Sequence, residues 1–123
     1  MKQFVNQIFT IIVDILPADW GKLAMHMSIS QGVQSMFFFV KGVNQEKYFS
    51  YYDLQQMGLF SKEEYRDVRL AIGKQSFEYK KNTKESWTGY TLVIGRSGNV
   101  EIDFEYSEQP IDIPTLWKDK YLN

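Results

Sequence analysis

Three carboxylates at alternate positions are the residues of this chain whose types and spacing could do chemistry. Glu101, Asp103 and Glu105 alternate with apolar residues in the stretch VEIDFEY, which begins at residue 100. Such alternation indicates a β-strand with one apolar and one polar face, because successive side chains point to opposite sides. The acids could keep one face of a sheet wet, bind a metal, perform acid–base catalysis or dock a basic partner.

Strand geometry argues against the metal site and the acid–base site. Alternate residues of a strand lie about 6.6–6.8 Å apart, whereas Ca²⁺ and Mg²⁺ hold their oxygen ligands at about 2.0–2.6 Å. A glycosidase pair needs carboxylates on two elements that flank a cleft, and nothing in the sequence supplies the cleft. Two interpretations stay open: the acids solvate the exposed face of an antiparallel strand, or they dock a basic partner.

The single histidine, His26, offers little for catalysis or metal binding. It shares one side of an alternating stretch with Lys22 and Ser28, and no cysteine or second histidine could complete a zinc site. A Ser–His–Asp triad stays open because triads are recognised by geometry, although no serine stands in a Gly-x-Ser-x-Gly elbow. We interpret His26 as a structural side chain, at the surface or half-buried, and predict no catalytic, metal-binding or cofactor-binding residue.

Composition and charge are those of an ordinary globular protein. The chain has 123 residues, of which 44% are apolar and 24% charged, and a net charge of −1. This length predicts a single domain over residues 1–123, and the balanced charge does not favour nucleic acid or a membrane as partner. Aromatic side chains could stack bases, but the acids of residues 100–112 would repel phosphates. These acids are Glu101, Asp103, Glu105, Glu108 and Asp112.

The N-terminal stretch predicts an amphipathic helix rather than a signal peptide or a membrane span. Polar residues interrupt its apolar run, no small-residue cleavage site follows, and the run is too short to cross a bilayer. Pro17 follows closely and cannot extend the helix. The apolar stripe at helical spacing consists of Phe4, Ile8, Ile11, Ile12 and Ile15.

Strand patterns follow the first helix. Residues 20–30 alternate, the stretch SMFFFVKG is apolar enough for a central strand, and KYFSYYD, residues 47–53, indicates a third strand. Short connections between them predict an antiparallel meander. The residues of the first strand that point to the core are expected to be Leu23, Met25, Met27 and Ile29.

A second helix and a final hairpin complete the pattern. Ser61 and Glu64 fit a capping box, and the helix that they begin ends near Lys84. Its apolar stripe consists of Tyr65, Val68, Ile72 and Tyr79. After Trp87, two strands are joined by a turn at residues 96–99. The core residues of this hairpin are expected to be Trp87, Tyr90, Leu92, Ile94 and Phe104.

The expected fold is α+β, in the order α-β-β-β-α-β-β plus a short C-terminal tail. An antiparallel meander sheet of about five strands packs against two main helices, which are expected to cover one of its faces. The tail carries Trp117, Tyr121 and Leu122, enough apolar surface to dock on the rest of the domain.

Three stretches of the chain resemble the YezG-like immunity (antitoxin) family. ILPADWGKLAMHMSIS resembles its helix-end Pro, Trp and first strand. ESWTGYTLVIGRSGNVEIDFEY resembles its Trp-Thr, apolar strand, Gly and Asp-Phe-x-Tyr signature, with Ser86 in place of the usual Pro. LWKDKYL resembles its closing Trp and aromatic tail. The resemblance covers nearly the whole chain in order.

This resemblance implies a cytoplasmic protein that binds and neutralises a cognate bacterial toxin, often a nuclease, delivered by a contact-dependent or secretion system. Such an immunity protein needs neither an active site nor a cofactor. The five acids between Glu101 and Asp112 are then expected to bind a basic toxin, and the chain is expected to be a monomer or weak oligomer. Two alternatives stay open: a small enzyme whose site is assembled from scattered residues, and an adaptor or structural domain without a toxin.

Overall fold

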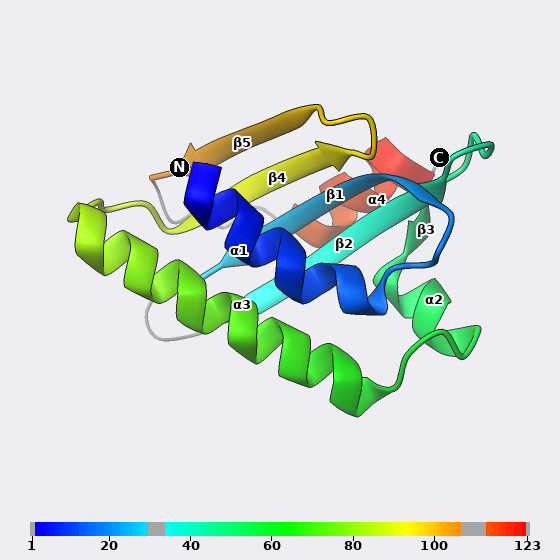
Figure 1. The fold of residues 1–123 in the computed structure, drawn as a ribbon, viewed down its shortest axis with the longest axis horizontal. Coiled ribbons are helices and arrows are strands. Elements are labelled where there is room, and N and C mark those ends of the chain that lie inside the picture. The colour runs from blue at the N-terminus through cyan, green and yellow to red at the C-terminus, as the bar shows by residue number, and fades with distance from the viewer. Residues whose placement is uncertain (1, 30–33, 107–112, 123) are drawn as a thin grey trace.

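An antiparallel five-stranded sheet with helices on both faces is the frame of the structure, a computed structural model that describes residues 2–29, 34–106 and 113–122 (Figure 1). The α+β fold expected from the sequence is confirmed. The elements in chain order are α1 (Lys2–Ile12), a 3₁₀ turn (Val13–Ile15), β1 (Trp20–Ser28), β2 (Ser35–Gly42), β3 (Phe49–Ser50), α2 (Tyr51–Gln56), α3 (Lys62–Thr83), β4 (Gly89–Gly95), β5 (Val100–Glu105) and α4 (Ile113–Leu122).

The strands lie in the spatial order β3-β2-β1-β4-β5. The first three form the expected meander, and α3 then returns the chain so that β4 pairs with β1 on its free side. β5 pairs with β4 and forms one edge of the sheet. This order puts β1 at the centre and the acidic strand at the border.

Helices α1 and α3 lie side by side across one face of the sheet (Figure 1). The predicted stripe of α1 is buried at Phe4, Ile8 and Ile12, and that of α3 at Val68 and Ile72. The apolar face of the strands supplies the other half of this core, as predicted. Its fully buried strand residues include Leu23, Met25, Met27, Tyr90 and Leu92.

The start of α3 follows the predicted capping box. The backbone N–H of Glu64 donates to Ser61 Oγ over 3.1 Å, and the N–H of Ser61 donates to Glu64 Oε1 over 2.9 Å. The two side chains therefore satisfy two of the amide groups that a helix leaves unpaired at its N-terminus.

The prediction of a third strand over residues 47–53 is confirmed only at residues 49 and 50. β3 contains only Phe49 and Ser50, and α2 begins at Tyr51. The physical reason is a second capping box, in which Ser50 Oγ accepts from the N–H of Asp53 and Asp53 Oδ2 accepts from the N–H of Ser50, each over 3.1 Å. This reciprocal pair begins a helix although aromatic residues favour strands.

The two main helices cover one face of the sheet as expected, and the C-terminal tail, which was not predicted to be helical, forms α4 on the other face. α4 lies behind the sheet in Figure 1, on the side opposite to α1 and α3. The Trp117 ring packs on Phe37 with centroids 5.0 Å apart, and the Tyr121 ring stacks on Phe39 at 5.5 Å. Both phenylalanines are buried, so the apolar β2 is covered from both sides. The docking of the tail through Trp117 and Tyr121 is confirmed.

A buried tyrosine hydroxyl predicts loss of stability in alkali. The Tyr90 hydroxyl lies 2.8 Å from Ser76 Oγ inside the core, and burial raises the pKa of Tyr90, against a smaller lowering by the bond to Ser76. Because the fold favours the neutral hydroxyl, Tyr90 contributes its full share of folding stability below pH about 10, the ordinary tyrosine pKa. This contribution is lost as the pH rises above that value. We expect the urea midpoint to fall above that pH, and to fall less in Tyr90→Phe. Equal declines would contradict this cause.

Candidate functional site

The acidic stripe lies on β5, at the border of the sheet (Figure 1). Glu101 and Asp103 are exposed, as predicted for the polar face of this strand. In the part of the chain that the structure describes, neither carboxylate forms a hydrogen bond or an ion pair. Both are therefore available to a partner. Glu108 and Asp112, the other two predicted contacts, lie outside the described residues.

Glu105, the third acid of the strand, is different because it reaches into the molecule. Its Oε1 atom lies 2.8 Å from Nε2 of His26, and the exposed fractions of the two side chains are 38% for Glu105 and 4% for His26. The carboxylate accepts a hydrogen bond from the imidazole when that nitrogen carries its proton. Glu105 is thus tied to the centre of the sheet while part of its side chain remains accessible.

A glycine between the two residues makes this contact possible. β4 separates β1 from β5, and Gly89 of β4 pairs with Ser28 on one side and with Glu105 on the other. A Cβ atom at Gly89 would lie only 3.0 Å from Glu105 Oε1 and 2.8 Å from the carbonyl oxygen of Met27. The missing side chain therefore leaves the path by which the Glu105 carboxylate crosses β4.

His26 is buried, and the expectation of a surface or half-buried imidazole is wrong. Its ring stacks on Phe37 with centroids 5.1 Å apart and meets the edge of Trp117 at 5.9 Å. α4 is the reason, since Trp117 covers a strand face that otherwise would be wet. Among the described residues, no serine hydroxyl hydrogen-bonds to His26. The pair of His26 and Glu105 therefore serves as a structural link between β1, β5 and the aromatic residues under α4.

Gly89→Ala is expected to destabilise the fold by about 1–3 kcal/mol, because the added methyl group would press on backbone and on the Glu105 carboxylate. Gly95→Ala is the matched control on the same strand, since the atom nearest to its added methyl group, Ser97 Oγ, would lie 3.6 Å away in ordinary contact. Thermal unfolding of both variants checks this. Equal melting temperatures of the two variants would show that β4 accommodates a methyl group at Gly89 without loss of stability.

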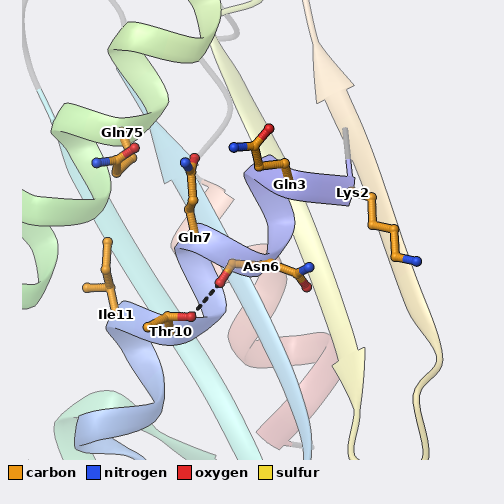
Figure 2. A pocket seen from close by; sticks show the side chains of 7 residues that line it. All are labelled: Lys2, Gln3, Asn6, Gln7, Thr10, Ile11 and Gln75. Atoms are coloured by element: carbon orange, nitrogen blue, oxygen red, sulfur yellow. Dashed lines mark hydrogen bonds between the residues drawn. The ribbon is translucent and has the colours of Figure 1, made fainter.

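A shallow groove of about 640 Å³ lies between α1 and α3. Figure 2 shows Gln7 of α1 and Gln75 of α3 lining it, whereas Lys2 points away from α3. The Thr10 hydroxyl donates to the backbone oxygen of Asn6 over 2.8 Å, so it is already used within α1. The amides can hydrogen-bond to a partner, but the groove holds no buried charge that would select a ligand.

A second hollow, of about 720 Å³, lies at the end of the sheet where β1, β2 and the β4–β5 turn meet. Two of its three cations already have contacts within the fold. Arg96 donates to the carbonyl oxygens of Ala18 and Trp20 over 2.9 and 3.0 Å, and Lys41 lies over the Tyr48 ring at 5.2 Å. Glu101 also lines this hollow, which disfavours an anion there.

Two features, a cluster of metal ligands and a helix that could span a membrane, are absent from residues 2–29, 34–106 and 113–122. No three His, Cys, Asp or Glu side chains of this part gather closely enough to hold a metal ion. No helix in it is long and apolar enough to cross a bilayer. Glu101 and Asp103 on the edge strand β5 remain as two exposed carboxylates without an ion-pair partner among the described residues.

Comparison with known proteins finds one family model and two curated relatives. The family model described as immunity protein YezG-like matches residues 1–123. The chain is similar to two curated proteins named Immunity protein YezG. The one from Bacillus spizizenii is 23% identical over 113 residues, which are 88% of this chain and 70% of the relative. The one from Bacillus subtilis is 22% identical over 99 residues, which are 77% of this chain and 66% of the relative.

Proposed function

The chain belongs to the YezG-like immunity protein family, whose role is immunity against a toxin, and we propose that it neutralises its cognate toxin in the cytoplasm by binding it, without catalysis. Inhibition by binding requires only a surface that complements the toxin. The buried position of His26, at 3% exposure, supports a binder, because the single imidazole of the chain does not face a substrate.

The observation that carries the proposed contact is the pair of unpaired carboxylates on β5. Glu101 and Asp103 are exposed and without a cationic partner in the described structure. Glu105 adds a partly exposed carboxylate beside them. We include Glu108 and Asp112, which follow closely in the sequence, in the same toxin-binding surface.

A nuclease is the toxin class that best fits an acidic surface. Proteins that grip nucleic acid place Lys and Arg against its phosphates, so the working surface of a nuclease is basic. Opposite charges speed the encounter of two proteins, and close charge pairs at an interface can couple by about 1.5–7 kcal/mol. We therefore propose a basic nuclease domain as partner, delivered by a contact-dependent or secretion system, with the chain acting as a monomer or weak oligomer.

Co-expression tests this proposal. A candidate toxin domain from the gene neighbourhood is produced in a host cell with and without the chain, and the purified proteins are passed together through a size-exclusion column. We expect survival only with the chain and co-elution of the two proteins. Toxicity that persists in the presence of the folded chain, with no complex on the column, would contradict the proposed function.

A further inference from the structure

We propose that the outer edge of β5 receives a strand of the toxin that carries Lys or Arg side chains, as a sixth strand of the sheet. The inference rests on the proposed function, because the toxin is the occupant. It adds the mode of binding: main-chain hydrogen bonds along the edge, with the acids of β5 selecting the partner.

The backbone of β5 is open along its outer side. β5 is the last strand in the spatial order and pairs only with β4. The carbonyl oxygen of Asn99 accepts from the N–H of Gly95 over 2.8 Å, and every second residue of an antiparallel strand bonds to the same neighbour. Val100, Ile102 and Phe104 therefore direct their N–H and C=O groups outward. No described residue hydrogen-bonds to that side.

The two edges of the sheet differ in the way that this proposal requires. β3 forms the opposite edge with only two residues, and α2 follows it directly. A strand this short offers little to an added strand. β5 has six residues, and Figure 1 shows no element beyond it. The long open edge of the described structure is thus the one that carries the free carboxylates.

Charge decides which strand can pair with this edge. A residue directly opposite on an added antiparallel strand has its Cβ about 4.5–5.5 Å away, where opposite charges stabilise and like charges destabilise. A second copy of β5, paired with the apolar faces together, would set acids against Glu101 and Asp103. A strand with Lys or Arg at alternate positions would match both acids, so the occupant is the basic toxin and not a second copy.

Amide hydrogen exchange of the unaltered chain, measured by NMR with and without saturating toxin domain, tests the mode of binding. We expect the outward amides of Val100, Ile102 and Phe104 to exchange fast in the free chain and at least about tenfold more slowly in the complex. The amides of Glu101 and Asp103, which point to β4, should be protected in both states. This alternation distinguishes strand addition from a partner that merely covers the surface.

Three outcomes would overturn the inference. A complex whose outward amides exchange as in the free chain would refute strand addition and leave toxin binding intact. Absence of any complex would refute the proposed function together with it. Protection of the outward amides that grows with the concentration of the chain alone would assign the edge to a second copy.

A pair of variants at one position gives an independent check. Val100→Pro removes an outward N–H at the first residue of an edge strand, where proline is tolerated, and Val100→Ala shortens the side chain but keeps the N–H. We expect Val100→Pro to bind the toxin about three- to tenfold more weakly than Val100→Ala, the effect of one hydrogen bond. Equal affinities would contradict the inference. If the proline variant does not fold, the amide hydrogen exchange of the unaltered chain still tests strand addition.

Discussion

Trp87→Ala is expected to shift the urea unfolding midpoint far below that of the wild type. Trp87 is 1% exposed, and its ring meets Tyr90 at 5.6 Å and Phe104 at 5.0 Å between centroids. Removing a buried aromatic side chain costs about 3–5 kcal/mol, against a total stability of about 5–15 kcal/mol for a typical domain. The loss therefore takes a large part of the free energy of unfolding.

Urea unfolding followed by circular dichroism measures this loss. Phe77→Ala is the matched control, because Phe77 is an aromatic residue of α3 that is 58% exposed. Phe104→Ala should fall between the two, since Phe104 is only half-buried beside Trp87. A Trp87→Ala midpoint equal to that of Phe77→Ala would show that the ring does not hold β4 and β5 on the core.

The double variant Glu101→Gln, Asp103→Asn is expected to bind the toxin more weakly, with a flatter dependence on salt. A charge at the rim of an interface mainly raises the rate of association, whereas truncating a charge buried against a cation costs about 2–5 kcal/mol. Exposed charges contribute only about 0–1 kcal/mol to folding, so the melting temperature should hardly change. Glu105 stays unaltered in this variant, because its contact with His26 would mix folding with binding.

The control for this prediction changes the same charge elsewhere. Glu63→Gln with Glu78→Gln removes two exposed acids of α3 and alters the net charge equally. Titration against the toxin domain at low and moderate salt compares both variants with the wild type. If the β5 variant binds the toxin as tightly as the α3 variant at both salt concentrations, the acids of β5 serve only to solvate the strand. The toxin contact then lies on another surface.

The sequence predicted those elements whose signals are local. The helical spacing of Phe4, Ile8 and Ile12 and the capping box at Ser61 each lie within a few turns of one segment, and the structure confirms both. The missed helix α2 carried an equally local signal. Ser50 and Asp53 have the spacing of a capping box, but the aromatic residues around them favoured the interpretation as a strand.

The candidate site was predictable only in part, because its geometry depends on strand order. Alternation along β5 was enough to place Glu101 and Asp103 on an exposed face. The contact of Glu105 with His26 joins residues 79 positions apart and requires β4 to lie between their strands with a glycine at the crossing. The burial of His26 depends on α4, and nothing local to residue 26 indicates that a helix of the C-terminal tail covers it.

Titration of the purified chain into an activity assay of the purified toxin domain tests the central claim most directly. If the chain neutralises the toxin by binding, toxin activity should fall in proportion to the chain added and reach its minimum near equimolar amounts. Full activity in the presence of excess folded chain would contradict the account. So would complete inactivation by a small fraction of an equivalent, because turnover of that kind is the mark of an enzyme and not of a binding inhibitor.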